Sequence, residues 1–416
     1  MTEGARAAAP AEAPIRRPEF RRLLAISITV ALGFGMLIPV LPGYARSFGV
    51  SLATAGLVQL VFGLTRFSFG IVGGLFVDRF GDRASTMTGL LIVSASSFAT
   101  GLATDFPMLV AARGFGGAGS SLFIAGLMTR ILRIIEPEAM GRASGTFRAS
   151  FLVGIAAGPL LGGLVATALG PAATFHFYGA GLLVATAIAW FAMRGATRGE
   201  GAQRKAPVEA LRAAAPLFSD VRYVAALAAT FVGWWTLSGP AQFIAAVFAE
   251  EELGFSEGQI GLAASLLAAG EIAALTVAGR AADRYGRRAV LVPTLVLTAL
   301  ATGLIGQTTG AAWAFYALLA VVGIGTAASG TAAGGLLGDA IPEGTSGAAV
   351  GVNQMAGDLG YLVAPSALGL VAGASSFGVA YGVAALPAAL AALLSLRLPA
   401  HRGPAGRESP ADAVEP

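Results

Sequence analysis

Long apolar stretches recur along almost the whole chain, separated by short polar or glycine-containing segments. A helix that crosses the ~30 Å hydrocarbon core of a bilayer needs about 20 mainly apolar residues. Because lipid offers no partner for backbone polar groups, each stretch is predicted to be an α-helix. We count twelve of them, at residues 23–45, 52–77, 84–104, 106–129, 143–169, 172–193, 223–249, 260–279, 289–307, 311–337, 346–372 and 375–396.

The composition supports lipid as the main solvent. Hydrophobic residues make up 56% of the 416 residues and charged residues only 12%, about half of the roughly 25% in soluble domains. A soluble fold of this size could not cover so much apolar surface. There is no cysteine, and the two histidines, His176 and His401, lie far apart. The sequence therefore predicts no disulfide, no metal site and no cofactor.

The basic residues indicate how the helices are oriented. If both termini are cytoplasmic, 23 of the 27 lysines and arginines fall in cytoplasmic segments, and only Arg46 falls in an outer loop. This asymmetry is typical of membrane proteins, and we expect a multi-pass protein of the cell (inner) membrane. The predicted parts are a cytoplasmic N-tail at 1–22, a six-helix bundle at 23–193, a polar linker at 194–222, a second bundle at 223–397 and a cytoplasmic C-tail at 398–416.

The two halves repeat each other. The segments GGLFVDRFGDR and AGRAADRYGRR place Asp78 and Asp283 at an offset of 205 positions, and a weaker echo places Pro159 and Pro365 at an offset of 206. Parallel repeats of six spans are a known plan of transporters. We expect an all-α membrane protein with twelve transmembrane helices in two pseudo-symmetric six-helix bundles.

These residues resemble the major facilitator superfamily over essentially the whole chain. Its loop signature Gly-x-x-x-Asp-Arg-x-Gly-x-Arg is met twice, although Asp82 stands where the family usually has a basic residue. The resemblance implies a central cavity between the bundles and a cytoplasmic gate braced by the two loops. The gate residues would be Gly74, Asp78, Arg79, Gly81 and Arg83 in the first copy, and Gly279, Asp283, Arg284, Gly286 and Arg288 in the second.

Span 5 resembles the drug:proton antiporter branch of that family. Glycines at every fourth position make one helix face smooth enough for close approach, and a proline kinks the helix. A generic packing face is the alternative interpretation. Arg113, Gly117 and Gly119 in span 4 are also similar to a signature of this branch, whereas span 1 lacks the acid of many relatives. The span 5 signature, Gly-x-x-x-Gly-Pro-x-x-Gly-Gly, is met by Gly154, Gly158, Pro159, Gly162 and Gly163.

Five ionisable residues are predicted inside the membrane, where a charge costs roughly 3 kcal/mol or more unless it faces protein or water. They are Arg66, Arg113, Arg148, Glu271 and Asp358. Because span 1 has no acid, we expect proton coupling through Asp358 or Glu271. In the fold that the chain resembles, spans 2 and 11 face each other, as do spans 5 and 8. Arg66 could then meet Asp358, and Arg148 could meet Glu271, when the cavity narrows. A purely structural ion pair is the alternative for each.

Aromatic, methionine and amide side chains on three spans are candidates for a substrate cavity, because they offer adaptable contact area. Each is more often a packing residue. The candidates are Phe34, Met36, Trp234, Trp235, Gln242, Phe243, Asn353 and Gln354.

The function favoured by these features is secondary active, proton-coupled export of a small organic molecule by alternating access. Uptake or efflux of a sugar or organic acid on the same fold is an alternative. A membrane-embedded enzyme or scaffold is a remote one, because the sequence shows no HExxH, GxSxG or nucleotide-binding motif. The expected partners are a small-molecule substrate, protons and the bilayer, without nucleic acid, and the expected functional unit is a monomer.

Overall fold

The structure is a computed structural model, which describes residues 15, 17–135, 140–193, 215–340 and 346–399. The described residues form a series of helices without strands. The first half contains α1 (Pro18–Leu37), α2 (Leu41–Arg46), α3 (Leu52–Gly101), α4 (Phe106–Ile134), α5 (Met140–Leu169) and α6 (Pro171–Ala192). The second half contains η3 (Ala215–Ser219), α8 (Val221–Ser238), η4 (Gly239–Ile244), α9 (Ala245–Glu251), α10 (Glu257–Tyr285), α11 (Arg287–Ile305), α12 (Ala312–Ala340), α13 (Ser346–Ala374) and α14 (Phe377–Ser395).

The helices account for the predicted spans. Ten helices in the described ranges are long and apolar enough to cross a membrane. The second part of α3, residues 82–101, and the series α8–η4–α9 supply two further crossings. The all-α membrane fold is thus confirmed. Most of the predicted tails and of the predicted linker lie outside the described residues, although α1 begins at Pro18 within the predicted N-tail, so the domain boundaries stay predictions.

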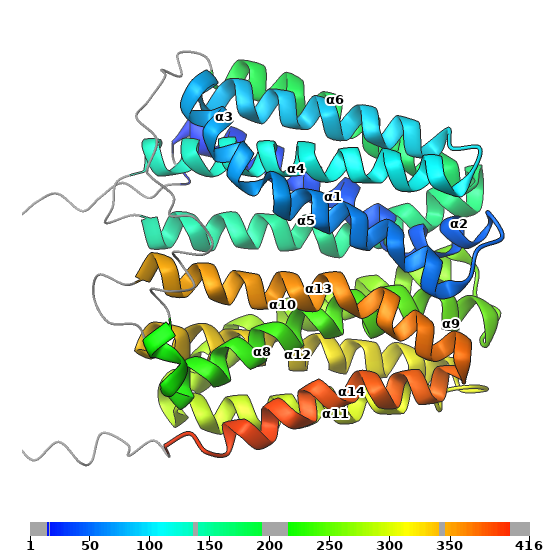
Figure 1. The fold of residues 1–416 in the computed structure, drawn as a ribbon, viewed down its shortest axis with the longest axis vertical. Helices are drawn as coiled ribbons and strands as arrows, with labels where there is room; N and C mark the ends of the chain where they lie inside the picture. The colour runs from blue at the N-terminus through cyan, green and yellow to red at the C-terminus, as the bar shows by residue number, and fades with distance from the viewer. Residues whose placement is uncertain (1–14, 16, 136–139, 194–214, 341–345, 400–416) are drawn as a thin grey trace, which may run out of the picture.

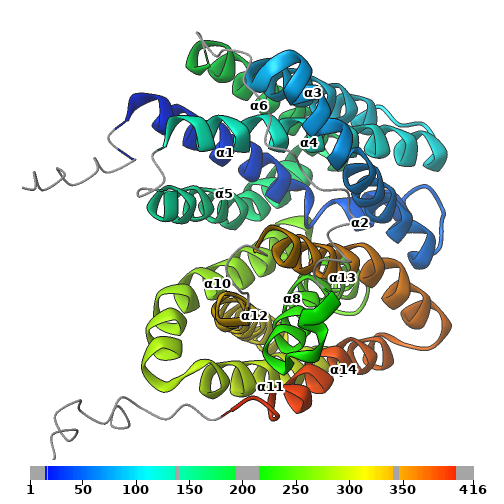
Figure 2. The same cartoon turned by 60° about the vertical axis from the view of Figure 1, so that its left-hand side comes forward.

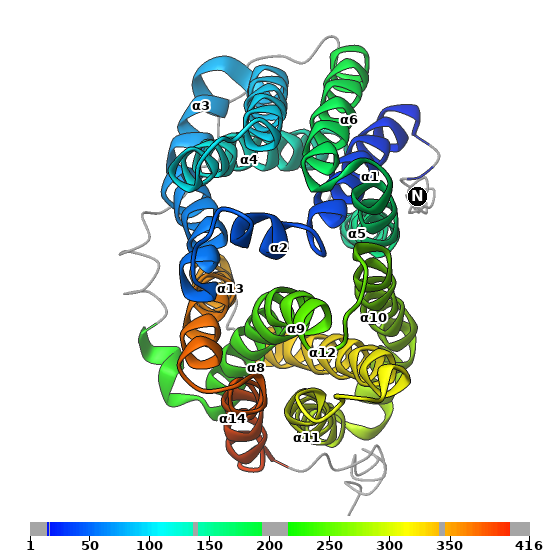
Figure 3. The same ribbon diagram turned by 90° about the vertical axis from the view of Figure 1, so that its right-hand side faces the viewer.

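The two bundles span the same layer side by side (Figure 1). α1 begins and α14 ends at the same end of the molecule, which we call the inner end; the α2–α3 and α9–α10 connections mark the outer end. Helices α1 to α6 pack together as one group and helices α8 to α14 as another (Figure 2). Seen from the outer end, α3 lies beside α13 on one flank and α5 beside α10 on the other (Figure 3).

Local sequence explains where several helices begin at the outer end. Ser51, Asp105 and Ser376 each accept a hydrogen bond from the backbone N–H three residues ahead, and Ser256 forms a capping box with Gln259. Such side chains satisfy amides that have no partner within the helix.

The repeated loop signature has the same backbone conformation in both halves. Gly81 joins the two spans of α3 with φ of +88°, and Gly286 joins α10 to α11 with φ of +91°. Residues with a Cβ rarely adopt this conformation, so glycine is required at both turns.

Candidate functional site: a pocket between the two bundles

The first and seventh spans are both interrupted in their outer halves. The first breaks at Ile38–Val40, where Pro39 lies between α1 and α2. The seventh widens into a π-helix at Gly239–Ile244, where Pro240 has no N–H to donate. Interrupted helices of this kind form the binding sites of many transporters.

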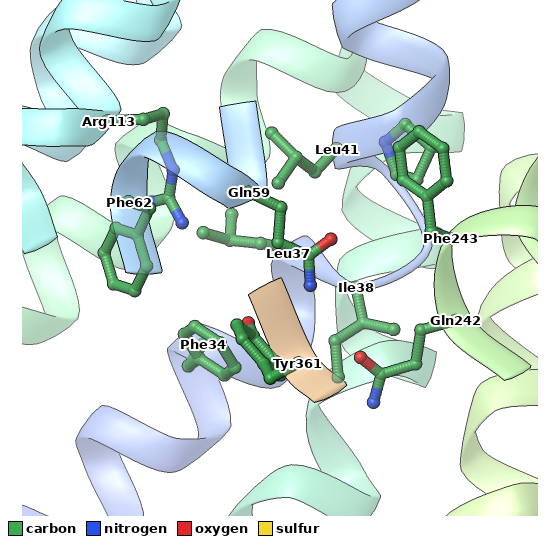
Figure 4. Close-up of a pocket in the computed structure, with 11 residues that line it drawn as sticks. Phe34, Leu37, Ile38, Leu41, Gln59, Phe62, Arg113, Gln242, Phe243 and Tyr361 are labelled. Atoms are coloured by element: carbon green, nitrogen blue, oxygen red, sulfur yellow. The ribbon is translucent and has the colours of Figure 1, made fainter. Parts of the chain in front are cut away.

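A pocket lies where these two interruptions meet. It has an empty volume of about 410 Å³, counting the part that is open to solvent, and both bundles contribute to its wall. Figure 4 shows the side chains converging from several helices. The lining residues are Phe34, Leu37, Ile38, Leu41, Pro42, Gln59, Phe62 and Arg113 from the first bundle, and Gln242, Phe243 and Tyr361 from the second.

Arg113 is held in the pocket by close packing of α4. A Cβ at Gly117 would lie 2.2 Å from the Phe62 carbonyl oxygen, and one at Gly119 would lie 2.8 Å from the Gly89 carbonyl oxygen. The two glycines of the span 4 signature therefore let α4 approach both parts of α3. Arg113 lies on α4 one helical turn from Gly117 toward the outer end, so this packing places its side chain beside Phe62.

The Arg113 side chain is charged and buried, and no acidic side chain among the described residues pairs with it. It is 3% exposed, and its guanidinium carbon lies 4.6 Å from the centre of the Phe62 ring. Its Nε and Nη1 atoms have no hydrogen-bond partner among the described residues. The described residues that line the pocket include no Asp or Glu. The site therefore presents a positive charge on a largely apolar and aromatic wall.

Two backbone contacts join the bundles near the outer end, one on each flank. A Cβ at Gly163 would lie 2.3 Å from the carbonyl oxygen of Glu257, the first residue of α10. A Cβ at Gly369 would lie 3.0 Å from the carbonyl oxygen of Leu52, the first residue of α3. The two contacts are related by the internal repeat. We call them the outer seals.

The predicted signature helix takes part in two interfaces. Gly154, Gly158 and Gly162 would each place a Cβ within 2.8 Å of α1, which shows how closely the two helices approach. Gly163 and the carbonyl group of Pro159 instead face α10 of the other bundle, where a Cβ at Gly261 would lie 2.3 Å from the Pro159 carbonyl oxygen. The motif thus packs its own bundle and borders the seam between the bundles.

An ion pair also crosses the outer end. Arg46 at the end of α2 binds Glu251 at the end of α9, and the two residues are 205 positions apart, which is the repeat offset. Their side chains are 32% and 37% exposed. From the sequence, Arg46 was recognisable only as the single basic residue of an outer loop.

The predicted membrane charges occupy different surroundings. Arg66 is exposed, and the Asp358 carboxylate accepts a hydrogen bond of 3.1 Å from Gln354 on the same helix. The structure does not join Arg66 to Asp358 in an ion pair, so that pairing stays a prediction for a narrowed cavity. Glu271 is partly buried on α10. The side chain of Arg148 lies outside the described residues, so its predicted pair with Glu271 is untested.

The described signature arginines contact their own bundles. Arg83 lies over the Trp190 ring at 4.3 Å, and Arg288 donates a 2.8 Å hydrogen bond to the carbonyl oxygen of Leu398. Trp190 is near the end of α6, and Leu398 follows α14, so the second arginine of each copy reaches the end of its bundle's last helix. The surroundings of Gly74 and the side chains of two further gate candidates, Asp78 and Asp283, lie outside what the structure describes.

The first arginine of each copy of the signature makes an equivalent contact with the aromatic residue that follows it. Arg79 lies over the ring of Phe80 at 5.6 Å, and Arg284 over the ring of Tyr285 at 5.3 Å. Gly279 faces α12, where a Cβ would lie 3.9 Å from Thr331 Cγ2.

Asp82, noted above as a departure from the signature, is fully buried and joins three helices. It accepts a hydrogen bond of 3.0 Å from Arg133 Nη1 and lies 3.8 Å from Arg130, both on α4. Arg130 Nε in turn donates to Glu19 on α1 at 2.6 Å. An acid at this position therefore ties the inner ends of α1, α3 and α4 together.

Some of the predicted cavity residues line the pocket, and the others make contacts elsewhere. Phe34, Gln242 and Phe243 line the pocket. Trp234 is exposed and meets Tyr361 edge to face, with ring centres 6.0 Å apart. Asn353 accepts a 2.8 Å hydrogen bond from Thr230 Oγ1, and Gln354 binds Asp358 as described.

Met36 and Trp235 are packing residues in this structure. Met36 is 7% exposed, and its backbone lies against Gly162 of α5. The Trp235 indole is 8% exposed and donates to the Ala384 carbonyl oxygen of α14 at 3.2 Å, away from the pocket.

Seven pocket residues were missed by sequence reasoning: Leu37, Ile38, Leu41, Pro42, Gln59, Phe62 and Tyr361. The available signals were weak. Gln59 is an isolated amide in an apolar span, and Tyr361 follows Asp358 by three positions, which places both on one helix face.

Comparisons with known proteins agree with this architecture. The chain is 29% identical to multidrug resistance protein 2 of Bacillus subtilis (strain 168) over 173 residues, which cover 41% of this chain and 43% of the relative. It is 28% identical to the quinolone resistance protein NorA of Staphylococcus aureus over 151 residues, which cover 36% of this chain and 39% of the relative. The matched regions thus span less than half the length of these relatives.

Solved structures resemble the whole fold. A bacterial homologue of the human lysosomal transporter Spinster, inward-facing and occupied, aligns with a TM-score of 0.77 at 16% identity, covering 92% of this chain and 96% of that one. A bacterial homologue of the iron transporter ferroportin, inward-facing, gives a TM-score of 0.71 at 16% identity, covering 91% and 98%. The sequence model of the Major Facilitator Superfamily matches residues 23–250 and 241–415. The chain therefore belongs to the Major Facilitator Superfamily.

Proposed function

We propose that this multi-pass membrane protein is a proton-coupled exporter of small organic molecules that works by alternating access. The observation that carries the proposal is the pocket built by both bundles at the interruptions of the first and seventh spans. The names of the multidrug and quinolone resistance relatives support export. A monomer with this pocket contains both halves of the site.

The arrangement of contacts supports an inward-facing state. The outer seals and the Arg46–Glu251 ion pair hold the bundles together at the outer end. In the proposed cycle these contacts separate, while the loops that carry Asp78 and Asp283 close the inner end. The basic residues of the sequence support cytoplasmic termini and a place in the cell (inner) membrane.

Asp358 is our first candidate for the proton-coupling residue, and Glu271 is the second. The Asp358 carboxylate lies one helical turn from the pocket residue Tyr361. A carboxylate in a partly buried position changes its proton affinity when substrate alters its solvation, which gives a route to coupling.

The experiment measures export in cells. Cells with and without the protein are loaded with toxic aromatic compounds of positive, neutral and negative charge, and efflux is followed before and after a protonophore collapses the gradient. We expect lower accumulation with the protein and loss of that effect with the protonophore. Equal accumulation across the panel with and without the protein would contradict export.

Coupling is tested with two variants. Asp358→Asn should lose the protonophore-sensitive efflux, whereas Asp105→Asn, the same change at an exposed position at the outer start of α4, should keep it, because asparagine caps a helix as well as aspartate does. If Asp358→Asn and Glu271→Gln proteins both keep that efflux, the coupling assignment is wrong.

A further inference from the structure

No acidic side chain in the part of the chain that the structure describes balances the positive charge of Arg113. The side chain is 3% exposed, and two of its three guanidinium nitrogens are buried without a hydrogen-bond partner. A buried charge is costly unless it is paired. The Phe62 ring offsets part of this cost, since an aromatic face attracts a cation, but it cannot accept the hydrogen bonds of the guanidinium.

The first bundle contains no acidic residue that could pair with Arg113 inside the membrane. None of its six predicted spans contains an Asp or Glu. A side-chain rotation within this bundle therefore cannot pair Arg113 inside the membrane. In the second bundle the Asp358 carboxylate accepts a hydrogen bond from Gln354, and this bundle contributes Gln242, Phe243 and Tyr361 to the pocket wall.

The guanidinium points into the pocket. Figure 4 shows it beside Phe62 and directed toward the space bordered by Phe34, Gln59 and Tyr361. The amide of Gln59 can donate a further hydrogen bond there. Around this polar corner the wall consists of aromatic and aliphatic side chains. A matching ligand has a flat apolar body and one anionic end.

We propose that the exported molecule is an aromatic or similarly apolar carboxylate, and that Arg113 binds its carboxylate group. A planar guanidinium binds a carboxylate through two parallel hydrogen bonds, and the pair is strongest where water is excluded. This inference rests on the proposed export function, which it deepens by naming the chemical class of the cargo.

Binding to the purified full-length protein in detergent tests the inference without transport. Isothermal titration calorimetry at pH 7 compares 2-naphthoate with its neutral analogue 2-naphthamide and with the cation 2-naphthylmethylammonium. We expect the carboxylate to bind at least about tenfold more tightly than either, since truncating one partner of a buried charge pair usually costs more than that.

Variants then locate the interaction. Arg113→Gln should remove the preference for the carboxylate, and Arg113→Lys should keep part of it, because lysine retains the charge but not the bidentate geometry. Arg21→Gln, the same change at an exposed position of α1, should leave the preference intact. Thermal unfolding of each protein shows whether it is folded.

The outcomes separate the two proposals. Equal or tighter binding of 2-naphthamide or the cation by the unmodified protein would overturn the inference, even if cells export other compounds. A folded Arg113→Gln protein that still prefers the carboxylate would overturn it as well. A carboxylate preference that depends on Arg113, together with no efflux in cells, would support carboxylate binding by Arg113 and contradict the proposed export function.

Discussion

One added methyl group at Gly163 should open the outer seal. Its Cβ would lie 2.3 Å from the carbonyl oxygen and 3.0 Å from the carbonyl carbon of Glu257, so it would meet backbone that cannot rotate away. Overpacking of this kind costs about 1–3 kcal/mol. In an outward-facing arrangement the two bundles separate at this contact and the clash disappears. A cost of ~2 kcal/mol would shift the equilibrium toward the outward-facing state by about 30-fold.

The natural absence of cysteine makes the shift measurable. Gln59→Cys introduces a single thiol on the pocket wall. A membrane-impermeant maleimide added outside intact cells should label this thiol only while the outer end is open. If the open state is rare in the unmodified protein, the labelling rate is proportional to its population, so Gly163→Ala should raise the rate by about 30-fold.

The control is Gly373→Ala on α13, where an added Cβ meets nothing within 4 Å. It adds the same methyl group to a helix and removes the same backbone flexibility, without a clash. Equal labelling rates in the Gly163→Ala and Gly373→Ala proteins would refute the seal. Slower labelling in Gly163→Ala would show that the contact favours the opposite state.

Two further changes address the ends of the molecule. Arg46→Ala should raise outside labelling only severalfold, because exposed ion pairs contribute about 0.2–1 kcal/mol, and a charge exchange with Glu251→Arg and Arg46→Glu should restore the original rate; no recovery would count against the pair. Asp82→Ala should lower the thermal stability of the purified protein, by about 1.5–3 kcal/mol, because it removes the fully buried carboxylate that accepts a hydrogen bond from Arg133 and lies beside Arg130. Glu252→Ala, at an exposed position, is the control, and equal melting temperatures for the two variants would contradict this role of Asp82.

The spans and the repeat were predictable because lipid imposes length and composition on every helix. The requirement for glycine at positions 81 and 286 also has a sequence signal, since both occupy the same place in a repeated motif. The close approach of α5 to α1 follows from glycines at Gly154, Gly158 and Gly162, whose spacing places them on one helix face.

The direction of single side chains was not predictable. Trp234 and Trp235 are neighbours, yet one faces Tyr361 and the other packs against α14, because successive helical residues differ by about 100°. The rotation of the helix about its axis depends on contacts with helices that are distant in sequence. The partners of Asp82 and Arg46 come from other helices for the same reason, and the repeat offset of Arg46 and Glu251 becomes informative only once both are seen at the outer end.

The contacts of Arg83 and Arg288 have a mechanical consequence. Each arginine connects the turn in the middle of its bundle to the end of that bundle's last helix. These contacts hold the helices of each bundle together at the inner end. A bundle held together in this way moves as a rigid body, because its helices do not bend against one another. The balance between the two states then depends mainly on the few contacts along the seam. Substitutions inside a bundle should change how much protein folds, whereas substitutions along the seam should change how often the transporter turns over.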